Sequence, residues 1–336
     1  MGLETEQKLT IAIVILNWNG KKLLEQFLPS VIQHSKQAEV YVADNASTDA
    51  SLLFIKETYP TVKIIKNNEN GGYAKGYNDA LSAVEADIFC LLNNDVEVTK
   101  DWLPPIVKAF TEDKNTAIIQ PKLLDFNKRD TFEYAGAAGG FIDKFGYPYC
   151  RGRIFNSIET DLGQYNDKAD IFWASGACLF IRSKVFKELN GFDESFFAHM
   201  EEIDLCWRAK NLNYTVKYVG ESTIYHVGGA TLSNLNPKKT YLNFRNSLFT
   251  LTKNAKGNLL FLIVVRLLLD GVAGAKFLME LKPKHTLAIL KAHLSFYGHL
   301  KQLIRQRNLT TFRRKYYTKT SIIADYFIFQ NKEFRT

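Results

Sequence analysis

The sequence predicts an α/β fold built on a doubly wound, mostly parallel sheet, followed by a helical, basic and amphipathic C-terminal extension. In the first part of the chain, short apolar runs that end in polar residues alternate with helical patterns, which is typical of βαβ units. The charge then changes sign along the chain. Residues 1–235 hold 24 Lys and Arg against 31 Asp and Glu, whereas residues 236–336 hold 19 against 4. The net charge of +8 therefore comes from the extension.

The first expected strand is Ile11–Leu16, an uninterrupted aliphatic run before a helical pattern that begins near Leu23. The next two strands are expected at Glu39–Ala43 and Val62–Ile65. A continuous apolar run fits a strand that is covered on both faces, as in a parallel sheet. Because ligands of such sheets bind beyond the carboxyl ends of the strands, polar residues at these ends are candidate site residues.

The fourth expected strand, Ile88–Leu92, ends abruptly in Asn93, Asn94 and Asp95. At the mouth of a crevice, the Asp95 carboxylate would supply a hard oxygen ligand that holds a divalent cation against a diphosphate. The alternative is that Asn94 or Asp95 caps a helix around Trp102. The residues alone leave both interpretations open.

Three further features lie in the second half of the catalytic part. A strand is expected at 171–181, where Trp173 either offers an aromatic face to a sugar or packs in the core. Glu201 and Glu202 open a helix, where acids complement the helix dipole, yet partly desolvated acids also suit a proton acceptor. His226 precedes two glycines at a strand end and is either a packed residue or a metal ligand.

Several functional classes are disfavoured by motifs that the sequence lacks. The glycines of Asn70–Asn78 do not spell G-x-G-x-x-G after the first strand, and no G-x-x-x-x-G-K-[ST] loop occurs, so neither a Rossmann dehydrogenase nor a P-loop kinase is expected. The four cysteines are scattered singly, which argues against a zinc knuckle and favours a reducing cytoplasm. The acidic N-terminus does not resemble a signal peptide.

A series of short motifs occurs in a fixed order: Asn17-Trp18-Asn19, Asp44-Asn45-x-Ser47-x-Asp49, Asn70-x-Gly72-x-Ala74-x-Gly76-x-Asn78, Asn93-Asn94-Asp95, Trp173-x-x-Gly176, Gly191-Phe192-Asp193-Glu194, Glu201-Glu202-x-Asp204-Leu205-x-x-Arg208 and His226-x-Gly228-Gly229. Over about residues 9–231, this ordered set resembles the inverting family 2 glycosyltransferases, in particular their rhamnosyltransferase-like bacterial branch. The resemblance implies the A-type glycosyltransferase fold, a nucleotide-diphosphate sugar donor, and Mg²⁺ or Mn²⁺ as cofactor.

The resemblance also implies residue roles. Asp44 would hydrogen-bond the pyrimidine base, Asp95 and His226 would bind the metal, and Glu202, with Glu201 beside it, would be the general base. The other implied donor-binding residues are Asn17, Asn19, Gly72, Lys75, Asn78, Asn93 and Asn94. The implied acceptor and sugar pocket holds Trp173, Gly176, Asp204 and Arg208. The chain departs from the family in two places, because its metal motif has one acid and Glu202 stands where the family usually has Asp.

The implied activity is transfer of a sugar, with rhamnose as one candidate, onto a glycan or lipid-linked acceptor in cell-surface polysaccharide synthesis. A sugar-nucleotide-binding protein without turnover is one alternative, because the metal motif has lost its first acids. A basic nucleic-acid-binding protein is another, suggested only by the extension. The chain contains no recognisable readout module, so nucleic acid is not an expected partner.

The catalytic domain is expected at 9–235, with a donor-binding half to about residue 115 and an acceptor-binding, catalytic half at 116–235. The extension, 236–336, is expected to be helical and membrane-associating.

Within the extension, the apolar run 258–265 is followed by Arg266 and Asp270 and is too short to span a bilayer. An interfacial or re-entrant helix is therefore expected, with nearby bases each gaining about 1 kcal/mol at an anionic membrane surface. This predicts a cytoplasmic protein that is peripheral on the inner face of the cell membrane. A soluble appendage that forms a homo-oligomer is the alternative.

Overall fold

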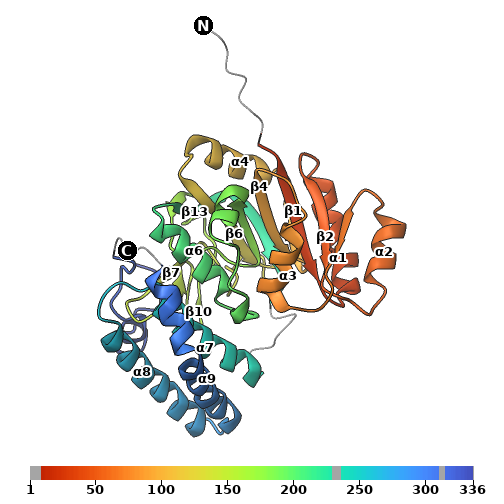
Figure 1. The fold of residues 1–336 in the computed structure, drawn as a ribbon. Helices are drawn as coiled ribbons and strands as arrows, with labels where there is room; N and C mark the ends of the chain where they lie inside the picture. Colours follow the sequence, from red (N-terminus) through yellow and green to blue (C-terminus); the bar gives the residue numbers. More distant parts are fainter. Residues whose placement is uncertain (1–8, 229–235, 310–314, 336) are drawn as a thin grey trace.

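The structure is a computed structural model that describes residues 9–228, 236–309 and 315–335. Its described part is built around one nine-stranded sheet in the order β11-β13-β6-β12-β4-β1-β2-β3, with β5 paired to β13. Helices cover the sheet, and three long C-terminal helices pack together at the end of the molecule away from α2 (Figure 1). The α/β fold class and the helical C-terminal part are thus confirmed.

The first half of the sheet is parallel, as predicted. Its strands are β1 (Ile11–Asn17), β2 (Glu39–Asp44), β3 (Lys63–Lys66) and β4 (Ile88–Asn93). The connecting helices are α1 (Lys21–His34), α2 (Ser51–Thr58) and α3 (Gly72–Leu81). The central strands β1 and β4 are buried along almost their whole length, which explains their continuous aliphatic sequence.

The second half of the sheet is mixed. β12 (Cys178–Arg182) runs antiparallel between β4 and β6 (Thr116–Asp125), and β6 runs parallel to β13 (Thr215–His226). The edge strands β5 (Val96–Val98) and β11 (Lys168–Asp170) pair antiparallel to β13. Parallel pairing therefore dominates only the half that precedes residue 95.

The remaining elements are shorter or lie outside the main sheet. A four-stranded sheet consists of β7 (Gly140–Ile142), β8 (Pro148–Cys150), β9 (Arg153–Ile154) and β10 (Ser157–Ile158). The helices of this region are α4 (Leu103–Glu112), α5 (Ser183–Glu188), the 3₁₀ turn η1 (Glu194–Phe196) and α6 (Glu201–Asn211). A single π-helical turn, η2 (Ala324–Ile328), lies near the C-terminus.

Two local predictions are wrong. The strand expected at 171–181 begins only at Cys178, because the backbone of Trp173 pairs with Gly140 and the chain then turns, with Cys178 N donating to Ser175 O. The capping alternative for Asn94 and Asp95 also fails. Strand β5 follows them directly, and α4 begins only after Trp102.

The C-terminal part consists of α7 (Pro237–Asn254), α8 (Leu259–Met279) and α9 (Pro283–Asn308). Helices α7 and α9 run parallel, since Thr240 bonds His285 near their beginnings and the Thr252 carbonyl accepts from Arg307 near their ends. No helix in the described parts of the chain is long and apolar enough to cross a membrane.

The expected domain boundary at residue 235 does not separate two cores. Leu248, Phe249 and Leu251 of α7 are buried in the same apolar cluster as the sheet residues. In addition, the buried Lys253 ammonium pairs with Asp193 and Asp204 at 2.6 and 3.0 Å. Helix α7 therefore packs into the same core as the sheet, as do Leu262 of α8 and Phe296 of α9, and the domain division at residue 235 stays a prediction.

Candidate active site

The carboxyl ends of β1, β2 and β4 form one polar edge, which we call the rim (Asn17, Asp44 and Asn93–Asp95). The parallel register places Asn17 beside Asp44. Asn17 Nδ2 lies 3.5 Å from Asp44 Oδ1, and Asn94 Nδ2 donates to Asn17 Oδ1 at 3.0 Å. The structure thus brings together rim residues that are 27 and 77 positions apart in the sequence.

Two of the predicted donor-binding residues are fixed by the turns they form. Asp44 is almost fully buried, and its Oδ2 accepts from the Ser47 backbone at 3.0 Å. Asn19 has a positive φ of 50°, and its Oδ1 accepts from Thr48 N at 2.7 Å. These contacts shape the loops after β1 and β2.

Behind the rim, His226 lies between two carboxylates. Its Nε2 is 3.2 Å from Asp95 Oδ1, and its Nδ1 is 3.3 Å from Glu133 Oε1. Burial on its own would lower the pKa of His226, but the charges of Glu133 and Asp95 outweigh it and raise the pKa to about 10. Asn93 Nδ2 lies 3.5 Å from the same Nε2. Sequence reasoning missed Glu133, because no motif marks it.

The Asp95–His226 pair offers a cation one hard oxygen and, once His226 gives up the proton that its raised pKa retains, one imidazole nitrogen. Across the described ranges, no group of three or more His, Cys, Asp or Glu is arranged to hold a metal ion. The Nδ1 atom of His226 is buried without an aligned hydrogen bond. These residues fit a divalent cation only if a bound diphosphate and water supply the remaining ligands.

The acidic pair lies at the first turn of α6, directly after a strained segment. Phe197, His199 and Met200 have φ values of 63°, 70° and 73°. Burial raises the pKa of Glu202 to about 7. Burial and the neighbouring Glu202 charge raise the pKa of Glu201 well above its usual range. The Oε2 atoms of both acids are buried without a hydrogen-bond partner in the described structure.

The loop 195–199, which leads into α6, is held from α7 and α3. Asn246 Nδ2 donates to three carbonyls of this loop at 2.7, 2.9 and 3.0 Å. Arg245 donates to two of its carbonyls at 2.8 and 3.0 Å. From α3, Tyr73 N donates to the Phe197 carbonyl at 2.8 Å. Sequence reasoning assigned Arg245 and Asn246 to the extension and so missed their role.

Gly72, at the start of α3, and Gly176, before β12, allow the backbone to pack closely beside the loop that leads into α6. Gly72 has a φ of 78°, and a Cβ there would lie 2.4 Å from the Phe197 carbonyl oxygen. Gly176 accepts a hydrogen bond of 2.8 Å from the Tyr73 hydroxyl. The pKa of Tyr73 is raised by burial first, and the charges of Tyr77 and Glu201 add to it. The acids of α6 and the start of α3 therefore belong to one cluster.

The structure does not bring Trp173 to a pocket. Its side chain is 3% exposed, and its Nε1 donates to the Phe141 carbonyl at 2.8 Å. The ring lies directly against Gly140, where a Cβ would overlap it. Trp173 therefore lies in the core of this structure, which is the second of the two interpretations that the sequence left open.

Asp204 and Arg208 hold neighbouring segments together instead of lining an acceptor pocket. Asp204 is fully buried and pairs with Arg208 at 2.8 Å. Arg208 also donates to the backbone carbonyls of Leu189 and Gly191. Asn78, expected at the donor, bonds the backbone N and O of Phe192 at 2.9 Å each. These three residues position the Gly191–Glu194 segment.

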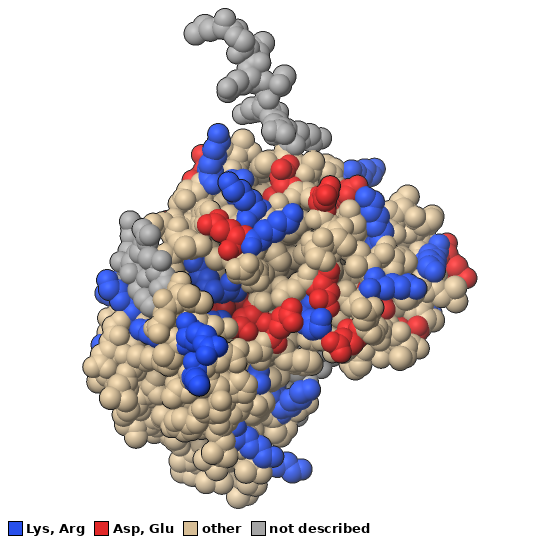
Figure 2. Space-filling model, viewed as in Figure 1, with Lys and Arg blue, Asp and Glu red and all other residues tan. Residues whose placement is uncertain are grey.

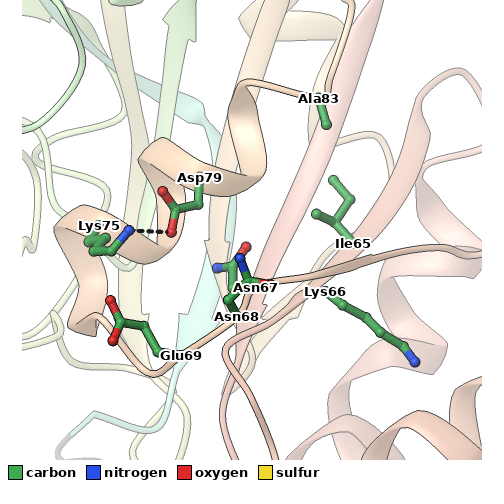
Figure 3. Close-up of a pocket in the computed structure, with 8 residues that line it drawn as sticks. All are labelled: Ile65, Lys66, Asn67, Asn68, Glu69, Lys75, Asp79 and Ala83. Atoms are coloured by element: carbon green, nitrogen blue, oxygen red, sulfur yellow. Dashed lines mark hydrogen bonds and ion pairs between the residues drawn. The ribbon is translucent and has the colours of Figure 1, made fainter.

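Lys75 lies in a separate depression of about 370 Å³ between β3 and α3 (Figure 3). Its ammonium points to Asp79 on the next turn, at 2.8 Å. The depression is lined by Ile65, Lys66, Asn67, Asn68, Glu69, Lys75, Asp79 and Ala83, and no rim residue belongs to this set. The structure therefore does not join Lys75 to the rim cluster.

Comparison with known proteins agrees with this architecture. The chain is 25% identical over 250 residues to N-acetylglucosaminyl-diphospho-decaprenol L-rhamnosyltransferase of Mycobacterium tuberculosis, covering 64% of the chain and 75% of that protein. The fold is similar to GalNAc-T7 solved with UDP, GalNAc and Mn²⁺ (TM-score 0.57, 17% identity), covering 74% of the chain and 48% of that chain. It is also similar to the mannosyltransferase PcManGT of Pyrobaculum calidifontis in complex with GDP-Man and Mn²⁺ (TM-score 0.54, 14% identity), covering 90% and 85%.

The sequence match extends over the parallel half of the sheet, β12 and α5. A family model described as glycosyl transferase family 2 matches residues 12–189, which is more than half of the chain. The matched region contains the whole rim and both glycine positions of the α3–β12 contact. The chain belongs to glycosyl transferase family 2.

Proposed function

We propose that the protein transfers a hexosyl residue, with rhamnose as the leading candidate, from a nucleotide diphosphate to a hydroxyl of a lipid-linked or glycan acceptor, with inversion. The observation that carries the proposal is the pair of buried acids at the start of α6, whose Oε2 atoms are unpartnered in the described structure. The relative from M. tuberculosis, an N-acetylglucosaminyl-diphospho-decaprenol L-rhamnosyltransferase by name, supports this substrate class.

The general base of the proposed reaction is Glu202. A pKa of about 7 lies near the working pH, where a carboxylate combines basicity with a large ionised fraction. Glu201 is the more deeply buried of the two and is held more firmly in its protonated form. Because the acceptor oxygen displaces the diphosphate directly, inversion needs no nucleophilic side chain.

The rim would bind the nucleotide diphosphate. Asp44, with Asn17 beside it, is proposed to receive the base, while Asp95 and His226 would hold Mg²⁺ or Mn²⁺ together with the diphosphate. When bound, the cation would neutralise charge on the leaving group. Of the residues assigned to the donor, Asn93 and Asn94 lie next to this cluster through their bonds to His226 and Asn17.

We further propose that α8 and α9 rest on an anionic membrane, on the inner face of the cell membrane. Arg266 and Asp270 of α8 point inward: they pair at 2.8 Å, and Arg266 also donates to the carbonyls of Phe145 and Gly146. The charges that interrupt the apolar run are therefore absent from its surface. Exposed apolar residues remain there and on α9, and we call them the outer face: Leu260, Phe261, Val264, Leu268, Val272, Leu287, Leu290, Leu294 and Tyr297.

A helix that buries Arg266 and Asp270 and exposes Leu260 and Leu268 is inverted, along this stretch, relative to a water-facing helix. In Figure 2 the surface over the C-terminal helices is largely uncharged, with Lys and Arg side chains at its borders. This arrangement suits a peripheral protein whose apolar side chains enter the headgroup region while bases contact anionic lipids. A homo-oligomer that buries the same face is the alternative.

A sugar-nucleotide-binding protein without turnover is the second candidate, favoured by the single acid of the metal motif. The test is to incubate the protein with UDP- and dTDP-sugars and Mn²⁺ and to measure release of the nucleoside diphosphate, with and without a polyprenyl-diphosphate-linked sugar. Release that rises with the acceptor supports transfer. Donor binding without any release would favour the second candidate.

A further inference from the structure

A groove of about 390 Å³ lies where α7 and α9 begin. It is lined by Pro237, Lys238, Tyr241, Lys284, Leu287, Ala288 and Lys291. Three of these residues are lysines and none is a carboxylate. None of the three lysines forms an ion pair with another residue in the described ranges. The groove therefore has an almost wholly apolar lining, to which three lysines without an ion-pair partner in the described ranges contribute.

The helix directions add to this charge. Helices α7 and α9 run parallel, so the helices that form the groove both begin there, after Asn236 and Lys282. The positive ends of both helix dipoles consequently lie near Lys238 and Lys284, which are in the first turns, whereas Lys291 lies about two turns further along α9. An anion is favoured at this place, and phosphate in particular, because lysine binds phosphate as a point charge.

The groove lies between the loop 195–199 and the outer face. The Lys238 ammonium lies 4.9 Å from the centre of the Phe197 ring, and Phe197 belongs to the loop that leads into the acids of α6. At Leu287 the groove meets the outer face, which continues along α9 through Leu290 and Leu294, one helical turn apart. An occupant with an anionic head and an apolar chain would therefore reach from the lipid surface toward the base.

We propose that this groove binds the phosphate groups and the first part of the hydrocarbon chain of a lipid-linked acceptor. The proposal rests on the proposed function and adds to it a site for the acceptor. The lysines would bind the phosphates by charge complementarity, and the apolar lining would contact the hydrocarbon chain. The position beside the loop 195–199 distinguishes this site from a general contact with anionic lipid, for which any exposed lysine would serve.

The test uses the full chain and farnesyl diphosphate as a probe, measured by isothermal titration calorimetry. Inorganic pyrophosphate and farnesol serve as separate arms, because each lacks one half of the proposed ligand. Farnesyl diphosphate is expected to bind more tightly than either. Replacing Lys238, Lys284 and Lys291 together with Ala should weaken its binding by on the order of tenfold or more, since each charge-assisted contact to phosphate is lost.

The matched control replaces Lys256, Lys276 and Lys301 with Ala. These exposed lysines belong to the same C-terminal part but lie outside the groove, so the net charge falls equally. The control should keep the affinity for farnesyl diphosphate, and Lys-to-Arg replacements at the three groove positions should largely restore it. Equal losses in both triple variants would overturn the proposal and leave a diffuse attraction to anionic lipid.

A further arm separates this inference from the proposed function. Binding of UDP- and dTDP-sugars with Mn²⁺ is measured on the same protein. If the donor binds while farnesyl diphosphate binds no more tightly than pyrophosphate, the groove assignment is wrong and the transferase assignment stands. If farnesyl diphosphate binds through the groove lysines but no nucleotide sugar binds or turns over, the groove remains a polyprenyl-phosphate site and the transferase proposal fails.

Discussion

The rim of the sheet and the α8 helix arrange charged residues in opposite ways. At the rim, polar side chains follow buried strands and face the place where a ligand would lie. In α8, the charged Arg266 and Asp270 are buried, whereas Leu260 and Leu268 face outward. The difference shows that a break in an apolar run has two meanings. At the rim it marks the proposed site, whereas in α8 it marks the side of the helix that packs against the rest of the protein.

The largest expected effect lies at the α6 acids. Replacing Glu202 with Gln keeps the size of the side chain but removes its proton-accepting oxygen, so kcat should fall by about 10²–10⁴-fold. Donor binding should be unchanged. The matched control, Glu201→Gln, should lose less activity in the same steady-state assay. A larger loss for Glu201→Gln would assign the base to that residue instead.

The second prediction tests whether α7 belongs with the rim or with α8. Replacing Asn246 with Ala removes the amide donor of three loop carbonyls, of which only that of Phe196 keeps a donor from Arg245, so the free energy of unfolding should fall by about 2–4 kcal/mol. Chemical denaturation measures this change. Asn243, which is only half-buried on the same helix, is the control. Its replacement with Ala should change the free energy of unfolding little. If the two variants were equally stable, the contacts of Asn246 would not hold α7 to the catalytic part, and α7 would belong to a separate extension.

The pH dependence of activity should follow Glu202. Because its pKa is raised from 4.5 to about 7, kcat/KM should fall about tenfold for each pH unit below 7, as the base becomes protonated. Stability should change in the opposite direction. The native state holds the Glu202 proton more tightly than the unfolded chain, so the contribution of this carboxyl to stability is greatest below about pH 4.5 and is lost as pH rises through 7. Glu202→Gln should reduce this decline; an unaltered profile would contradict the assignment.

The smallest expected effect concerns the outer face. Replacing Leu268 with Glu puts a charge on the exposed side of α8 and should lower binding to anionic vesicles several-fold, measured by sedimentation. The control is Leu53→Glu on α2, which is exposed to a similar extent, at 57% against 67%. High salt should weaken the basic contribution but leave part of the apolar one. If both variants and the unaltered protein bound vesicles equally, the outer face would not be a membrane contact, and its alternative role in a homo-oligomer would be favoured.

The features that the sequence predicted correctly are local in the chain. Strands β1, β2 and β4 and the polar residues after them follow from short apolar runs, and parallel pairing then gathers Asn17, Asp44 and Asp95 at one edge. The order of the strands did not have to be known to predict this, because the carboxyl ends of all parallel strands lie at the same edge of the sheet.

The remaining contacts depend on tertiary packing between distant segments. Glu133 reaches His226 across 93 positions, and Asn246 reaches the loop 195–199 from a helix that composition assigned to the extension. Trp173 had two open interpretations that only its burial could decide. For Arg266 and Asp270, the spacing of four residues already places both on one face of a helix, and this signal was present in the sequence.

The most direct test of the central claim is cation-dependent donor binding at the rim. Thermal unfolding is measured with UDP- and dTDP-sugars, with and without Mn²⁺, for the unaltered protein, for Asp95→Ala and for the exposed control Asp130→Ala. Binding to the native state raises the midpoint by mass action. We predict a Mn²⁺-dependent shift that Asp130→Ala keeps and Asp95→Ala loses. A shift of equal size in Asp95→Ala would contradict the account.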